Sequence, residues 1–108
     1  MSRPTFNLGV FLDKEKLKSD GSNFVSWHRH LRILLNPIKL SYILDAAIGD
    51  ALADTASDDK NKVYQTKKDD SDLVQSGMLF AMESGLQKRF ENDDAYKIIT
   101  ELKMIFAP

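Results

Sequence analysis

The residues best suited to chemistry are two histidines, His28 and His30, which lie two positions apart in a stretch with helical hydrophobic spacing. On a helix their side chains point about 200° apart, so the two rings cannot bind one metal ion together. Ser26 lies four residues before His30 and can touch it on one helix face. Without a placed orienting acid or oxyanion donor, that pair does not indicate nucleophilic catalysis. We therefore expect no catalytic residue and no metal site, with His28 partly buried and His30 solvated.

Three pairs of adjacent aspartates suggest calcium at first sight: Asp58-Asp59, Asp69-Asp70 and Asp93-Asp94. None has the alternating oxygen ligands, central glycine and terminal glutamate of an EF-hand loop. Helix caps and solvated loop charges explain these pairs better, because aspartate favours helix N-termini. The chain also has no Gly-rich phosphate loop, so we expect no cofactor.

The charge balance argues against a strongly charged partner. The 15 basic and 16 acidic residues give a net charge of −1, so no overall field favours nucleic acid or an anionic membrane. RNA binding could be argued from Arg29 and Arg32, or from a group of lysines that aspartates interrupt: Lys60, Lys62, Lys67 and Lys68. We interpret this group as a solvated helix face and expect RNA to bind weakly at most.

The composition narrows the class of protein further. There is no cysteine among the 108 residues, which excludes disulfides, thiol catalysis and cysteine-bound zinc. No long apolar run predicts a signal peptide or a membrane span. We expect a single domain that lies in the cytoplasm and has no membrane partner.

Both histidines lie in the first clearly predicted helix, from Phe24 to Asn36, which Ser22 or Asn23 can cap and Pro37 ends. Trp27 could serve as a stacking platform for a base. Its place within an apolar stripe favours core packing instead. The members of that stripe are Phe24, Trp27, Leu31, Leu34 and Leu35.

The later segments are also helical in pattern. A turn or two is expected within 38–44, and helical character resumes at Lys60. Asp70 or Ser71 can cap a fresh helix that runs to about Glu83, and this helix is apolar on so many sides that we place it centrally. A short helix follows over 86–90. A last helix, capped by Asn92, Asp93 or Asp94, has one apolar face formed by Ala95, Ile98, Ile99, Leu102, Ile105 and Phe106.

Two segments look irregular. Residues 1–21 are predicted to form an extended arm whose apolar residues alternate: Phe6, Leu8, Val10 and Leu12. Residues 45–59 are predicted to form a long acidic loop, in which 50–53 can make a short helix. The fold class we expect is all-α, a small bundle of about five helices over 22–108 to which the arm and the loop are attached.

Residues 17–35, LKSDGSNFVSWHRHLRILL, resemble the opening signature of Copia-type LTR retrotransposon Gag polyproteins. That signature has a leucine, a glycine, an asparagine-aromatic pair and a tryptophan three residues after the aromatic. Two later segments, SDLVQSGMLFAMESGLQKRFEN and DAYKIITELKMIF, are similar to plant members, so the resemblance covers nearly the whole chain. The signature residues are Leu17, Gly21, Asn23, Phe24, Trp27, Leu31, Leu102 and Phe106.

The resemblance implies a capsid role. Gag of this family is the structural polyprotein that assembles virus-like particles around retroelement RNA, and its helical capsid region has two lobes. The resemblance implies that this chain corresponds to the N-terminal lobe. It carries no Cys-Cys-His-Cys zinc knuckle, the part of Gag expected to bind RNA most directly. The implied partners are further copies of the chain, in weak contacts, and the rest of Gag, and no enzyme activity is implied.

Two apolar residues fall outside the stripes. Ile33 lies about 180° from the main stripe of its helix, and Met104 lies about 180° from the stripe of the last helix. The candidate self-association surfaces are therefore the face of Ser26, Arg29 and Ile33 and the face around Met104. Two alternatives stay open: a host-derived helical module that binds a protein or peptide in a groove, and a weak nucleic-acid-binding domain.

Overall fold

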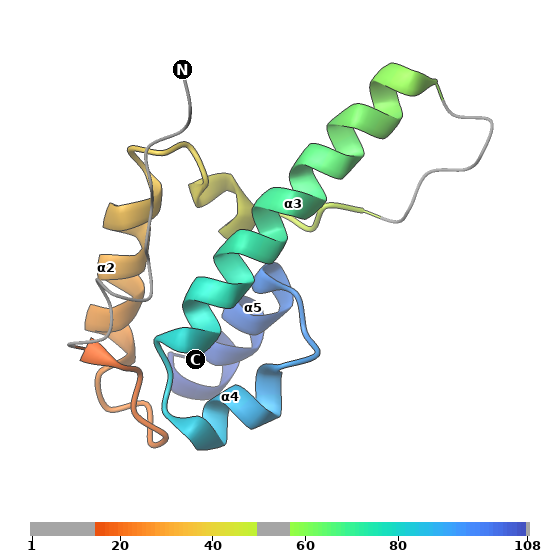
Figure 1. Cartoon of the computed structure of the whole chain (residues 1–108). Helices are drawn as coiled ribbons and strands as arrows, with labels where there is room; N and C mark the ends of the chain where they lie inside the picture. Colours follow the sequence, from red (N-terminus) through yellow and green to blue (C-terminus); the bar gives the residue numbers. More distant parts are fainter. Residues whose placement is uncertain (1–14, 50–56, 108) are drawn as a thin grey trace.

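Four α-helices and one 3-10 turn make up the regular structure of the computed structural model, which describes residues 15–49 and 57–107. In chain order they are α2 (Phe24–Leu35), η2 (Ser41–Leu44), α3 (Asp58–Phe80), α4 (Ser84–Phe90) and α5 (Ala95–Phe106). Figure 1 shows α3 running across the molecule, with α5 behind it, α2 beside it and α4 at the base. The all-α prediction is confirmed, and the described part of the chain contains no strand.

The described ranges contain four α-helices where about five were predicted, because two expected helices form one. Helix α3 runs without a break from Asp58, with Ser57 as its cap, so Asp70 and Ser71 lie inside it. The Asp70 carboxylate accepts a hydrogen bond from the Tyr42 hydroxyl at 2.6 Å. An aspartate with such a tertiary partner has no need of a backbone amide, and the helix continues through it.

The predicted irregular segments are only partly covered by the described residues. Helix α3 begins at Asp58, which shortens the acidic loop predicted over 45–59. The short helix expected over 50–53 lies outside the described residues, as do the four alternating apolar residues of the predicted arm: Phe6, Leu8, Val10 and Leu12. Further along, the Asp94 side chain caps α5 by accepting from the Lys97 amide at 2.8 Å, as one of the three predicted caps.

The core lies between the apolar sides of α2, α3 and α5. Helix α2 buries Phe24, Trp27, Leu31 and Leu35, so the predicted stripe and the predicted burial of Trp27 are confirmed. The helix expected to be apolar on many sides and central lies within α3, where Leu73 and Phe80 are exposed. Ile105 of α5 is also exposed, beyond the last buried turn. Helix α3 therefore buries one side, chiefly through Val74 and Met78.

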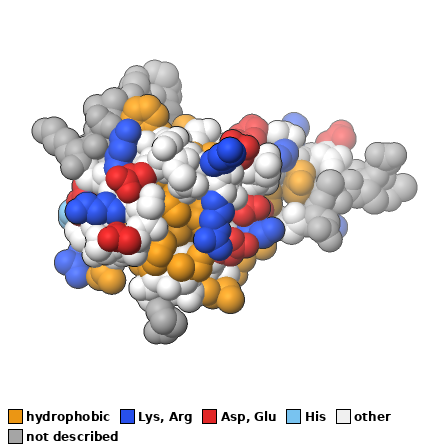
Figure 2. All heavy atoms as spheres, turned by 90° about the horizontal axis from the view of Figure 1, so that it is seen from below, with side chains coloured by type: hydrophobic (Ala, Val, Ile, Leu, Met, Phe, Trp, Pro, Cys, Tyr) orange, Lys and Arg blue, Asp and Glu red, His pale blue; other side chains and the backbone are white. Residues whose placement is uncertain are grey.

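Charged side chains of both signs are mixed on one face of the molecule. Figure 2 shows Lys and Arg beside Asp and Glu on the face seen from below, with hydrophobic side chains between them. This face has no broad region of one sign, in agreement with the net charge of −1. None of the helices in the described ranges is long and apolar enough to cross a membrane.

Candidate functional site

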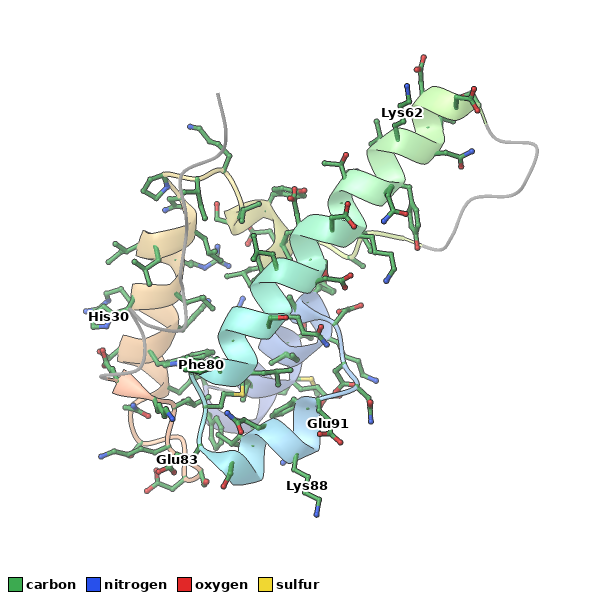
Figure 3. All side chains as sticks on the ribbon, viewed as in Figure 1. His30, Lys62, Phe80, Glu83, Lys88 and Glu91 are labelled. Carbon is green, nitrogen blue, oxygen red and sulfur yellow. The ribbon has the colours of Figure 1, made fainter. Side chains whose placement is uncertain are left out.

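Ser26 and His30, the pair considered for catalysis, both contact the carboxylate of Glu15, which lies eleven residues before Ser26. The Ser26 hydroxyl donates to Glu15 Oε1 at 2.7 Å, and Nδ1 of His30 contacts Glu15 Oε2. In a catalytic triad the histidine lies between the acid and the serine, where it can take the hydroxyl proton. Here the acid lies between the other two groups, so the serine is not activated. The contacts instead hold residue 15 against the outer side of α2, where Figure 3 shows His30.

The same contacts set the ionisation of Glu15. The hydrogen bond from Ser26 holds the pKa of the Glu15 carboxyl below its usual value, and His30 adds to this effect. Glu15 was absent from the sequence predictions. Its distance in sequence from α2 gives no local periodicity that links it to Ser26 or His30.

His28 belongs to a separate, partly buried cluster. Its ring stacks on Phe24 with centroids 5.5 Å apart, and its Nε2 accepts from Arg32 Nε at 3.1 Å. Arg32 also pairs with Asp45 at 2.8 Å. Burial, followed by the positive charges of Arg32 and Lys103, lowers the pKa of His28. The expectation of a partly buried His28 and an exposed His30 is confirmed.

No group of three or more potential ligand residues in the described ranges could hold a metal ion. The pKa of Asp45 is lowered by the Arg32 hydrogen bond, which identifies it as an ion-pair partner of Arg32. The arrangement around His28 therefore joins α2 to the segment that follows η2.

The Ala81 carbonyl, between α3 and α4, is the point where several signature residues converge. It accepts from the Leu17 amide at 2.8 Å and from Nε1 of Trp27 at 3.0 Å. Leu17 also pairs with Met82 as an isolated parallel bridge. The buried indole therefore has the hydrogen-bond partner that its N–H needs.

Asn23 holds the same segment from the other side. Its Nδ2 donates to the Lys16 carbonyl at 2.8 Å, and its Oδ1 accepts from the Lys18 amide at 2.9 Å. The side chain therefore makes no capping bond to α2, although Asn23 occupies the cap position. Asn23 can make this bridge because its side-chain amide offers both a donor and an acceptor.

The remaining signature residues close the cluster. Gly21 has φ +70°, and the ring of Phe106 lies directly over it. Phe106 in turn packs against Phe24 with centroids 6.0 Å apart, while Leu31 and Leu102 are fully buried. Six of the eight signature residues thus lie in or against one core, while Gly21 contacts Phe106 and Asn23 bonds to the segment before α2.

The candidate self-association residues lie outside this cluster, three on α2 and Met104 on α5. Ile33 is 57% exposed and Met104 is 71% exposed, and Arg29 is exposed beside Ile33. Ser26 differs, because its hydroxyl is engaged by Glu15. Val25, one helical turn before Arg29, is a further exposed apolar residue, which was not predicted from the sequence.

An open hollow of about 530 Å³ lies against the first turns of α3. Its lining combines aliphatic and aromatic surface with two lysines and one aspartate: Ile48, Gly49, Asp59, Lys60, Val63, Tyr64 and Lys67. This hollow includes two of the lysines that the sequence singled out, Lys60 and Lys67. The apolar part of the lining was not predicted as a surface.

No family model matches the chain, and no curated protein or solved structure matches it. Three surfaces outside the core can contact another molecule: the outer face of α2, the outer face of α5 and the hollow on α3.

Proposed function

We propose that this domain is a structural, self-associating module that resembles the N-terminal capsid lobe of a Copia-type Gag and contributes contacts to a virus-like particle. The proposal carries no enzymatic step. We place the assembly in the cytoplasm, with the rest of Gag as a further partner and RNA bound weakly at most.

The observation that carries the proposal is the contrast between Leu31 and Ile33 on α2. Leu31 is 0% exposed, whereas Ile33, two residues later, is 57% exposed on the opposite side. The exposed side also carries Val25 and Arg29, at a spacing of four residues that places all three on one face. An apolar face flanked by polar groups is typical of surfaces that meet another protein.

The face around Met104 supports the same proposal from another element. Met104 and Ile105 are both exposed near the end of α5, although the other side of the preceding turns is buried through Ala95, Ile98, Ile99 and Leu102. A particle subunit needs at least two distinct surfaces, because contacts between unlike patches can propagate from copy to copy. Each contact is expected to be weak alone and to gain strength through multiplicity.

The experiment compares Ile33→Asp with Leu31→Asp. Ile33→Asp places a carboxylate in solvent, so the isolated domain should keep its helical content and its melting temperature. Within a Gag polyprotein that carries this domain, the same change should reduce the number of particles, because a contact would then bury an unpaired charge. Leu31→Asp, the matched control, should unfold the domain. Normal particle numbers with Ile33→Asp would remove this face from the assembly.

The hollow on α3 favours a second candidate, a host-derived module that binds a protein or peptide. Its mixture of apolar lining and lysines fits an amphipathic segment. A domain that remains monomeric at every concentration and binds one cellular peptide tightly would favour this candidate over self-association.

A further inference from the structure

The first half of α3 lacks the packing that supports the other helices. Figure 1 shows it extending beyond the rest of the bundle. Every residue from 57 to 69 is exposed except Tyr64, which is half-buried. An isolated helix as short as this half is only marginally stable in water, because helices in proteins gain most of their stability from the packing of an apolar face. The projecting half is therefore a candidate for contact with another molecule.

One side of this projecting half is both apolar and basic. Lys60, Val63, Tyr64 and Lys67 follow the spacing i, i+3, i+4 and i+7, so they share one helix face, which we name the α3 stripe. These residues line the hollow of about 530 Å³, and Val63 is 56% exposed. Within the described ranges no ion pair joins Lys60 or Lys67 to an acid. Asp59 is the acidic residue at the edge of the hollow.

The outer face of α5 has the complementary composition. Lys97, Glu101, Met104 and Ile105 follow the spacing i, i+4, i+7 and i+8 and form what we name the α5 stripe. Lys97 pairs with Asp93 at 3.4 Å, which offsets its charge. Glu101 has no ion pair in the described part of the chain, so the stripe is acidic at its centre and apolar at its end.

We propose that the α3 stripe of one copy binds the α5 stripe of a second copy, with Lys60 and Lys67 facing Glu101 and with Val63 facing Met104. This inference rests on the proposed self-association. Opposite charge and matched helical spacing favour this occupant over a nucleic acid, which would leave the apolar residues uncovered. Both stripes carry exposed apolar residues in one molecule, Val63 in the first and Met104 in the second, so each copy uses both. The contact is heterologous and can extend into a ring or a filament.

Charge reversal in the full 108-residue chain tests the contact. The measurement is sedimentation equilibrium up to millimolar protein, with circular dichroism to check each fold. Lys67→Glu and Glu101→Lys should each weaken self-association about tenfold, because each places like charges together. An equimolar mixture of the two variants should recover it, since every contact between unlike variants has opposite charges. Lys88→Glu makes the same charge change on α4, at the far end of the molecule from Lys62 (Figure 3), and should have no effect.

The possible outcomes separate the inference from the function on which it rests. If the wild type associates and both reversals behave like Lys88→Glu, the stripes are not the contact, while self-association stands. If the wild type stays monomeric throughout and Ile33→Asp leaves particle numbers unchanged, both proposals fail. If Lys67→Glu loses binding to a uridine oligonucleotide without changing self-association, the lysines serve RNA and the inference is overturned.

Discussion

A β-carbon at Gly21 would lie 2.1 Å from Cδ1 of Phe106, so the glycine near the start of the chain is fitted to the aromatic at the end of α5. The backbone at Gly21 also has φ +70°, which side chains disfavour. Gly21→Ala should therefore destabilise the domain by about 2–4 kcal/mol, from backbone strain and displacement of the ring together. Chemical denaturation gives the value.

Gly49→Ala is the matched control for this prediction. Gly49 has φ +87°, but no described atom lies within 4 Å of the β-carbon position. Its replacement should show the strain alone, about 1 kcal/mol. The double variant Gly21→Ala/Phe106→Ala should lose less stability than the sum of the two single losses, because the smaller side chain removes the collision. Equal effects of the two glycine replacements would mean that Phe106 does not press on Gly21.

Trp27 is expected to stabilise the domain through both packing and its indole N–H. Trp27→Ala should cost about 3–5 kcal/mol, because the side chain is fully buried. Trp27→Phe keeps most of the apolar surface and removes the donor to the Ala81 carbonyl, so it should cost about 1–3 kcal/mol. The Leu17 amide still satisfies that carbonyl. An unchanged melting temperature in Trp27→Ala would contradict the core position of Trp27 and would favour the hypothesis that its ring is a stacking platform for a base.

The burial of Trp27 could be predicted because helical periodicity records which side of α2 is apolar. The partner of its N–H could not, since Ala81 lies 54 residues further along the chain. The same limit applies to Glu15 and its contacts with α2. Local patterns identify a face, whereas the group that meets the face is selected by the whole fold.

In helix α3 the error was of the opposite kind, because a tertiary contact took precedence over a local sequence signal. Asp70 is a good cap residue by type, yet the Tyr42 hydroxyl provides it with a tertiary partner inside a continuous helix. Leu73 and Phe80 belong to the helix that was placed centrally from its apolar composition, yet both side chains are exposed. A helix wheel gives angular positions but not how many neighbouring elements are available to cover them.

His28 makes stability depend on pH. Because the pKa of His28 is lowered in the folded domain, the unfolded chain binds the proton more readily between that lowered pKa and the ordinary value. The stabilising contribution is complete above the ordinary value of about 6.5 and is lost as pH falls towards the folded pKa. Stability should therefore fall as the pH drops below about 7 towards that lowered pKa, and His28→Gln should flatten the decline. Melting temperatures across this range give the slope.

Asp45→Asn serves as the control for His28. The Asp45 charge raises the pKa of His28, so its removal should lower that pKa further and extend the loss of stability to lower pH. Glu15 and Asp45 have lowered carboxyl pKa values, and their contributions are lost only at more acidic pH. A decline with the same slope in wild type and His28→Gln would show that His28 does not titrate with unfolding.

RNA binding should be weak and independent of sequence. The lysines on the exposed half of α3 are interrupted by aspartates, and the surface in Figure 2 mixes both signs. If three lysines, Lys60, Lys62 and Lys67, contact phosphates, the logarithm of the association constant for single-stranded RNA should fall with a slope of about −2 against the logarithm of salt concentration. Fluorescence anisotropy with a labelled oligonucleotide measures this slope.

Replacement of those three lysines by glutamine should bring the salt slope close to zero, because the released counterions come from the phosphates that they contact. The single change Lys88→Gln, on α4, should leave the slope unchanged. Stacking of a base on the indole is not expected, since Trp27 is fully buried. Submicromolar binding at physiological salt, with one preferred sequence, would require base contacts that these lysines cannot make and would replace self-association by nucleic-acid recognition.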